Sequence, residues 1–418
     1  MSDTAVAALD LAGFDLRALP AGFHDDPYRW YAALRSQSPV RWMPDGSLLL
    51  TRWAECEAVY RDAKLFSSDK RVEFGPKFGS GPLFQHHTTS LVFNDPPLHT
   101  RVRRLIAGAL TARATDALQP ALVAWVDHLL DDMAAKAGRG EAVDLIEDFA
   151  SAIPIEVIGN LLRIPPAERG PLRAWSLAIL GALEPQLDAA QLAAGHQAVT
   201  EFSDYLRVLV AQRRAQPGDP ATDVLTRLIQ GEPAASPSAD AQRLTEQELL
   251  QNCIFILNAG HETTTNLIAN GLLTLLQWPA QKSLLLAQPD LIRPAVEEFL
   301  RFEPSNQLSN RISTDVSTLG GGAVPAGTRI TLCIGAANRD PAMLAHPDAL
   351  DISRQPNRHL AFGFGVHQCV GMTLARLEGR VAIGRFLQRH PNYTLAGDAL
   401  RGGRVRFRGY LRAPLQGL

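Results

Sequence analysis

Cysteine side chains can bind metals or act as nucleophiles, and one of the four cysteines lies in a different sequence environment from the other three. No two of them have the spacing of a metal-binding pair, and four cysteines in 418 residues do not make a disulfide framework. Cys56, Cys253 and Cys333 lie in segments that read as buried helix or strand, where cysteine usually serves as a small apolar residue. Cys369 lies in a glycine-rich loop and is therefore the candidate for chemistry.

The loop around Cys369, residues 362–371, has the sequence FGFGVHQCVG and is followed at once by a helical pattern. Glycine allows tight turns and lets a flat ligand come close to the backbone. Backbone N–H groups and the dipole at a helix start stabilise a thiolate and lower its pKa, and a metal ligand needs that anion. By themselves, these features favour a metal-binding thiolate and a buried structural cysteine equally.

A second candidate site lies inside a long apolar segment, residues 245–277. Thr245 and Glu248 form a capping box at its start, and apolar residues on every side predict a helix buried in the core. Its middle reads AGHETTTN, residues 259–266. Glycine and consecutive threonines are poor helix formers, and a buried acid needs partners. Such a conflict indicates either a functional site or a polar patch bonded to neighbouring helices.

The elements that must position these residues are mostly helices, so the predicted fold class is mainly α with small β-sheets. Leucine- and alanine-rich helical spacing predicts helices over residues 26–36, 53–61, 98–110, 114–137, 145–161, 166–183, 189–212, 219–229, 245–277, 281–288, 292–301 and 371–389. Short strands are predicted at residues 40–42, 48–51, 329–334 and 406–413. Residues 231–240 read as an exposed loop, and residues 66–93 as a long loop of the functional or mobile kind.

Three motifs together resemble the cytochrome P-450 superfamily. Residues 362–371 match every fixed position of its haem-binding signature, and AGHET at residues 259–263 is similar to its oxygen-binding motif. Glu298 and Arg301 match its Glu-x-x-Arg motif, and Arg354 looks like the third member of that buried ion-pair network. The matches run from about residue 95 to residue 371, so the chain is identified as a member of this superfamily.

The resemblance implies roles for individual residues around haem b, which would lie between the long central helix and the cysteine-loop helix. Cys369 would be the fifth ligand of the iron, with Phe362 packed beside its sulfur. Glu262 and Thr263 would be catalytic and relay protons to dioxygen, and Thr264 could share the hydroxyl role. The residues that would bind the cofactor are His99, Arg103, Ala259, Gly260, Arg311, Phe362, Gly363, His367, Cys369 and Gly371.

The implied activity is that of a haem-thiolate monooxygenase that hydroxylates, epoxidises or dealkylates a small organic substrate. Its electrons would come from NAD(P)H. No Gly-x-Gly-x-x-Gly fingerprint follows a strand and no cysteine cluster could bind an iron–sulfur centre, so separate partners are expected, a ferredoxin and a ferredoxin reductase. Arg104 and Arg376 are the candidate docking contacts beside Cys369.

Two rival functions stay open. One is a haem peroxygenase driven by hydrogen peroxide, which would not need the acid and alcohol of Glu262 and Thr263. The other is a non-catalytic haem sensor, which would have equally little use for that pair. The presence of both residues favours the monooxygenase over either rival.

Composition excludes several other classes of protein. The formal net charge is −2, which does not indicate nucleic acid as a partner. No apolar run reaches the roughly 18 residues of a membrane span, and the first twenty residues have no basic start, so neither a membrane protein nor a signal peptide is expected. We expect a cytoplasmic monomer with one catalytic domain, residues 1–418.

The substrate itself is not predicted, although several segments are expected to contact it. These are residues 66–93, 183–187, 255–259, 305–308 and 407–410. Phe74, Phe78 and Phe84 could offer an apolar lining, and Lys70, Arg71 and Lys77 could attract a carboxylate.

Overall fold

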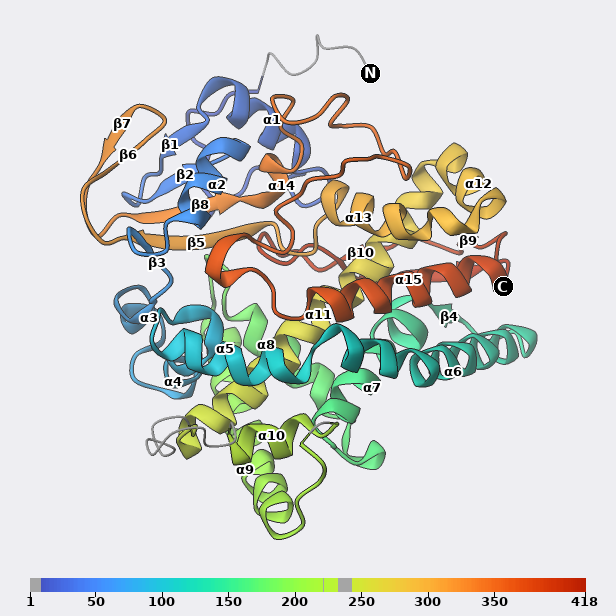
Figure 1. Ribbon diagram of the computed structural model, residues 1–418. Helices are drawn as coiled ribbons and strands as arrows, with labels where there is room; N and C mark the ends of the chain where they lie inside the picture. The colour runs from blue at the N-terminus through green and yellow to red at the C-terminus, as the bar shows by residue number, and fades with distance from the viewer. Residues whose placement is uncertain (1–8, 221, 232–242) are drawn as a thin grey trace.

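The structure is a computed structural model that describes residues 9–220, 222–231 and 243–418. The chain is predominantly helical with small sheets, which confirms the predicted fold class (Figure 1). Most of the predicted 231–240 loop lies outside the described residues. The α-helices are α1 Tyr28–Gln37, α2 Trp53–Arg61, α3 Arg71–Phe78, α4 Pro82–Thr89, α5 Leu98–Ala109, α6 Ala112–Gly138, α7 Ala152–Leu161, α8 Leu172–Gly181, α9 Ala189–Ala215, α10 Val224–Gln230, α11 Glu246–Gln277, α12 Pro279–Ala287, α13 Ile292–Phe302, α14 Ile334–Ala337 and α15 Met372–Arg389.

The strands form one mixed sheet and three smaller sheets. The larger sheet has the order β1-β2-β8-β5-β3, in which β2 and β8 are parallel and the other pairs are antiparallel. With α1 and α2 it forms the upper left part of Figure 1. The strands are β1 Val40–Trp42, β2 Leu48–Leu50, β3 Phe66–Ser67, β4 Val143–Asp144, β5 Leu308–Ser313, β6 Ser317–Leu319, β7 Gly322–Val324, β8 Arg329–Cys333, β9 Thr394–Leu395, β10 Leu400–Arg401, β11 Tyr410–Arg412 and β12 Pro414–Gln416.

The predicted central helix is α11, which crosses the middle of the molecule (Figure 1). Its capping box forms as expected, because the Thr245 hydroxyl accepts from the Glu248 N–H and the Glu248 carboxylate accepts from the Thr245 N–H. Helices α4, α7, α8, α9, α13 and α15 pack around it. Tertiary packing on all sides therefore compensates for the poor helix formers in its middle.

Several of the predicted elements differ from the structure. The predicted helices 166–183 and 219–229 become α-helical only at Leu172 and Val224, and a π-helix, Ile146–Ala150, precedes α7 within 145–161. Residues 66–93 are not a long loop, because they contain β3, α3, α4 and the short 3-10 helix η2, Leu91–Phe93. Both α-helices are only eight residues long, and Gly75 and Pro76 obscure the period of the first, so packing of Phe74 and Phe78 into the core supports it instead. In the predicted strand 406–413, only β11 is a strand, and Phe407 makes an isolated bridge with Asn306.

No helix in the described part of the chain is long and apolar enough to cross a membrane.

A fully buried ion pair on α13 holds the segment that leads to the cysteine loop. Arg301 donates from Nε and Nη2 to the Glu298 carboxylate at 2.8 and 2.7 Å. The same carboxylate accepts from the Asp351 backbone N–H at 2.8 Å and the Asn357 amide at 2.9 Å, and Arg354 Nε lies 3.3 Å away. The predicted network of Glu298, Arg301 and Arg354 is confirmed.

Replacing Arg301 with methionine leaves the Glu298 carboxylate buried with less positive charge beside it. We expect Arg301→Met to reduce stability by about 3–5 kcal/mol, the range for breaking a buried pair, as measured from urea unfolding of the haem-loaded protein. The matched control is Arg207→Met on α9, whose partner Asp204 is also exposed, and it should cost no more than about 1 kcal/mol. Equal losses in the two variants would contradict a dominant role for the α13 pair.

Candidate active site

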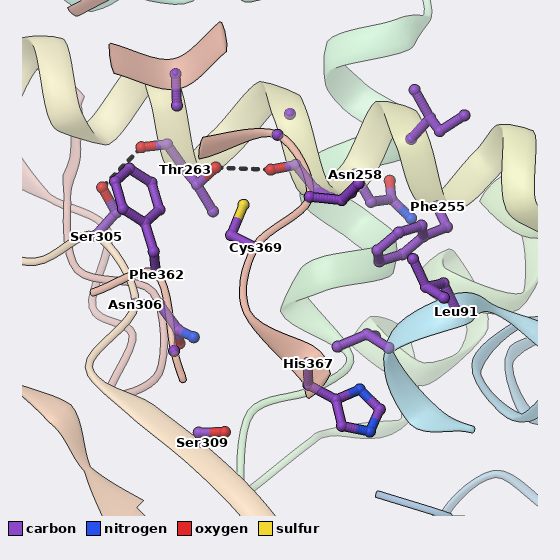
Figure 2. A pocket seen from close by; sticks show the side chains of 18 of the residues that line it. Leu91, Phe255, Asn258, Thr263, Ser305, Asn306, Ser309, Phe362, His367 and Cys369 are labelled. Carbon is purple, nitrogen blue, oxygen red and sulfur yellow. Dashed lines mark hydrogen bonds between the residues drawn. The ribbon is translucent and has the colours of Figure 1, made fainter. Parts of the chain in front are cut away.

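A cavity of about 320 Å³ lies between α11 and the cysteine loop (Figure 2). Its wall takes residues from elements far apart in the chain: α4, α5, α7, α8, α11, β5, the cysteine loop, α15 and the segment before β11. Most of the lining is apolar and includes Leu91, Leu180, Leu183, Phe255 and Phe407. The cavity is thus apolar with a few convergent polar groups, as small-molecule sites generally are.

One face of α11 borders the cavity. Phe255, Ala259 and Thr263 follow each other at four-residue spacing and all line it. Ala259 is exposed although its helix is otherwise buried, because its methyl group faces this cavity. Gly260 also lines the cavity, and a Cβ on this residue would meet the Ile158 side chain of α7 at 2.7 Å. Glycine at that position therefore lets α7 approach α11 closely.

Hydroxyl groups supply extra hydrogen bonds to the α11 backbone at this point. The Thr263 hydroxyl donates to the Ala259 carbonyl at 2.7 Å, and the Ser305 hydroxyl donates to the Thr263 carbonyl at 2.7 Å (Figure 2). Such bonds from a threonine to the preceding turn are known to loosen or bend a helix. Thr264 lines the cavity too, although its side chain is buried. The hydroxyls of Thr263 and Thr264 therefore both stay candidates for the proton relay.

Glu262 lies outside the wall of this cavity. Its carboxylate accepts two hydrogen bonds from Arg404 Nη1, at 2.7 and 2.8 Å, and it lines a separate small cavity of about 20 Å³ together with His261 and Thr265. Burial raises the pKa of Glu262 to about 7, and the Arg404 charge opposes that rise. The predicted acid–alcohol pair is thus adjacent in sequence, but its two functional groups face different spaces.

The cysteine loop keeps its shape through backbone contacts. The Cys369 N–H donates to the Phe362 carbonyl at 2.8 Å, and α15 begins three residues later. Gly363 and Gly365 have φ values of 65° and 71°, which favour glycine. A Cβ on Gly365 would also lie 2.5 Å from the Tyr60 carbonyl oxygen. The glycines are therefore required by the path of the loop.

The Cys369 sulfur faces the cavity toward α11 (Figure 2). Burial raises the pKa of its thiol, while a hydrogen bond from the Gly371 backbone and the charges of Arg103 and Arg376 oppose the rise. The backbone near the helix start therefore lowers this pKa as expected, but burial outweighs it in the chain without a bound cation. A bound cation would be needed to hold the thiolate, as is general for metal-ligating thiols.

Cationic and imidazole groups gather at one end of the same cavity. His99, Arg103, Arg311 and His367 all line it, and the His99 and His367 rings lie 4.1 Å apart. Burial lowers the pKa of His99 to about 4 and also lowers that of His367. Both ring nitrogens of His99 and Nε2 of His367 are buried without a hydrogen-bond partner. Among the described residues, Arg311 has no carboxylate at ion-pair distance.

These unpaired donors fit the haem that the resemblance implies. Buried polar groups are nearly always hydrogen-bonded, so the unpaired nitrogens at this end point to partners from a ligand. A flat dianionic group would supply two carboxylates to them, opposite a cysteine sulfur and beside the small Ala259. The residues named from the sequence as cofactor-binding all line this one cavity: His99, Arg103, Ala259, Gly260, Arg311, Phe362, Gly363, His367, Cys369 and Gly371.

Several lining residues were not singled out from the sequence. Glu378 on α15 is buried, its Oε2 has no hydrogen-bond partner, and burial raises its pKa to about 8. His87 on α4, Asn258 on α11 and Arg406 also line the cavity. The acid at position 378 could have been noticed, because it follows Leu374 and Leu377 on the inward face of its helix. The other three depend on how distant segments fold together.

Other sequence-based expectations need correction. Phe74 and Phe78 do not line the cavity but pack around the His87 ring. Arg376, a candidate docking contact, donates to the Glu297 carboxylate at 2.6 and 2.8 Å and stacks over the Phe362 ring at 4.7 Å. Its charge is already paired within the chain, so it serves to hold the cysteine loop.

Comparison with known proteins agrees with this geometry. The family model "Cytochrome P450" matches residues 187–392. The chain is 34% identical over 380 residues to the biotin biosynthesis cytochrome P450 of Bacillus subtilis, covering 90% of this chain and 91% of that protein. It is 37% identical over 394 residues to the vitamin D(3) 25-hydroxylase of Pseudonocardia autotrophica, covering 93% of each.

Solved structures show the same fold. P450BioI in complex with an acyl carrier protein ligated to hexadec-9Z-enoic acid has a TM-score of 0.86 at 33% identity, covering 94% of this chain and 99% of that one. CalO2 has a TM-score of 0.87 at 29% identity, covering 97% and 98%. The likeness extends over nearly the whole chain and includes the cysteine loop. The chain belongs to the cytochrome P450 family, whose members carry haem, and is an oxidoreductase that incorporates oxygen into its substrate.

Proposed function

We propose that this chain binds haem through Cys369 and oxygenates a small organic substrate by hydroxylation, epoxidation or dealkylation, as a monomer with a single catalytic domain. The observation that carries the proposal is one cavity that joins the Cys369 sulfur, the hydroxyl-bearing face of α11, the cationic Arg103 and Arg311, and imidazole nitrogens of His99 and His367 without hydrogen-bond partners. Bound haem would supply the activation of dioxygen, and thiolate ligation favours cleavage of the O–O bond.

The chain's own residues would orient the cofactor and substrate. His99, Arg103, Arg311 and His367 would donate to the two propionates, which requires cationic groups in a buried place. The small side chain at Ala259 leaves space at the middle of α11. The apolar wall around Phe255 would exclude water from the substrate. These roles remain proposals that the variants below can test.

A proton route would run through the two adjacent residues of α11. Thr263 would hold a proton at its hydroxyl, and Glu262 would supply protons because a group with a pKa of about 7 can both give and take them at neutral pH. The small cavity beside Glu262 has room for about one water. Delivery to the main cavity would require the carboxylate to leave Arg404, since the two residues now face different spaces.

Electrons would come from NAD(P)H through a ferredoxin and a ferredoxin reductase. The sequence has neither a dinucleotide-binding fingerprint nor a cysteine cluster for an iron–sulfur centre. We place the docking surface on the face next to Cys369. Arg376 is not a free contact there, because Glu297 neutralises it.

The thiolate assignment is tested by the absorbance of the reduced carbon monoxide complex. The haem-loaded protein should show the red-shifted band of thiolate ligation, and Cys369→His should replace it with an imidazole-type spectrum. Cys253→Ser provides the control, since Cys253 is buried on α11 outside the cavity wall and should leave the band in place. An imidazole-type spectrum in the unmodified protein would overturn the assignment.

The propionate assignment is tested through haem retention. Arg311→Leu removes a buried donor and should speed haem transfer to apomyoglobin by roughly 10- to 100-fold, since a hydrogen bond to a charged group contributes about 1.5–3 kcal/mol. Arg329→Leu is the matched control: this arginine lies on the neighbouring strand β8, is 42% exposed and pairs with Asp45. Identical transfer rates in the two variants would count against Arg311 as a propionate donor.

The relay hydroxyl is tested by the fate of the electrons. Thr263→Ala should keep the carbon monoxide spectrum and substrate binding but divert NAD(P)H oxidation from product to hydrogen peroxide. Thr264→Ala is the comparison, because its hydroxyl lines the same cavity one residue away. Uncoupling confined to Thr264→Ala would move the relay to that residue, and unchanged coupling in both variants would assign it to water.

A further inference from the structure

We propose that the substrate carries a carboxylate on an apolar body, and that Arg406 on the cavity wall binds the carboxylate. This inference rests on the proposed function, because it concerns the substrate of the same cavity. It follows from the position of Arg406, from its unpaired charge and from the character of the wall around it.

The backbone of Arg406 is held on both sides, so its side chain has a defined direction. Its N–H donates to the Glu184 carboxylate at 3.1 Å, and its carbonyl accepts from the Gln307 N–H at 2.8 Å. The guanidinium donates from Nη1 to the Leu308 carbonyl at 3.2 Å and from Nη2 to the Asn310 side chain. These contacts present the guanidinium on the cavity wall, while its buried Nε has no hydrogen-bond partner.

No carboxylate among the described residues lies at ion-pair distance from this guanidinium. The two acids that influence it most are committed elsewhere: Glu73 pairs with Lys70 at 3.3 Å, and Glu184 accepts from two backbone N–H groups. Burial lowers the pKa of Arg406, which shows that its charge is costly where it is. A buried charge without a partner is strongly unfavourable, so a charged ligand would relieve it.

A second cation and an unpaired imidazole lie near Arg406. Burial lowers the pKa of Lys77 to about 8, and its Nζ donates to the Glu184 backbone carbonyl at 2.5 Å rather than to a carboxylate. His87 lines the cavity, is 2% exposed, and has a buried Nε2 without a partner. The charges of both Lys77 and Arg406 act on the His87 ring. A carboxylate here would meet N–H donors from separate elements.

The haem propionates do not explain Arg406. They have donors of their own in His99, Arg103, Arg311 and His367. The contacts of Arg406 run instead to Leu308 and Asn310 of β5, and its charge acts on His87 of α4. β5 also carries Arg311, so Arg406 lies between the propionate donors and the His87 side of the cavity, and we assign it to the substrate because the propionates already have four donors.

The rest of the cavity wall is mostly apolar, with a few polar side chains such as Asn258, Ser305 and Asn306. Leu91, Leu180, Leu183, Phe255, Ile256 and Phe407 line it. A mostly apolar wall with a cationic group matches an amphipathic acid, whose carboxylate would bind Arg406 while its apolar body contacts the apolar side chains. The position of Arg406 would then decide which carbon is presented for oxidation.

The test compares acids with their primary amides, which differ in charge but hardly in size. A panel of straight-chain alkanoic and arylalkanoic acids, each beside its amide, is titrated into the haem-loaded protein by calorimetry and by the spin-state shift. We expect at least one acid to bind at least about ten-fold more tightly than its amide, since a charge-assisted pair contributes about 1.5–3 kcal/mol. Equal affinities throughout the panel, or no binding by any acid, overturn the proposal.

Arg406→Gln should abolish the preference for acid over amide, and Arg412→Gln should keep it. Arg412 is the matched control, because it lies on the same segment but is exposed and outside the cavity wall. His87→Phe, which preserves the aromatic packing, should reduce the preference by a smaller factor. A retained preference in Arg406→Gln overturns the role of this residue.

Haem retention and the carbon monoxide spectrum distinguish failure of this inference from failure of the proposed function. If Arg406→Gln loses haem as Arg311→Leu is expected to, Arg406 serves a propionate and the proposal fails. If the unmodified protein lacks the thiolate carbon monoxide band, the proposed function fails instead. Calorimetry does not depend on the iron ligand, so acid preference is measured independently of that outcome.

Discussion

The buried pair of Glu298 and Arg301 is the interaction on which the placement of the cysteine depends. Both side chains are fully buried, so their charges are tolerable only because nearly every polar atom has a partner. Those partners come from residues 338–357, the segment that precedes the cysteine loop. Satisfying one ion pair therefore fixes that segment against α13, and α13 packs on both α11 and α15.

Buried polar groups need partners, and inside the cavity some of them lack one within the described chain. There, His99 and Arg406 carry buried nitrogens that no described residue satisfies, and Nε2 of His367 has only the Asp95 carboxylate, 3.8 Å away. The satisfied ion pair on α13 and the unsatisfied donors in the cavity are related. A rigid frame can hold unpaired donors in place until a ligand binds them. Preorganised donors of this kind cost no rearrangement when the charged group binds.

Glu262 and Thr263 are neighbours on α11, but their functional groups face different cavities. The Glu262 carboxylate is hydrogen-bonded to Arg404 in the small cavity, while Thr263 borders the large one. Arg404 lies on the segment that also carries Arg406, which lines the cavity. One segment thus contributes to both spaces: Arg404 holds the acid in the small cavity, and Arg406 lines the large one.

By itself the sequence determined the cysteine, the glycine loop, the buried central helix and its capping box, and the members of the α13 network. These features depend on short-range spacing. Such spacing can be recognised in the sequence because a helix start, a turn or an i, i+3 pair involves near neighbours. The helices α3 and α4 escaped prediction because each has only eight residues, and Gly75 and Pro76 also hide the period of α3. Only the tertiary structure decided that Arg404 pairs with Glu262, 142 residues away, that Glu297 neutralises Arg376, and that Arg406 lines the cavity. Contacts of this kind are set by how distant segments pack, and no local pattern in the chain encodes them.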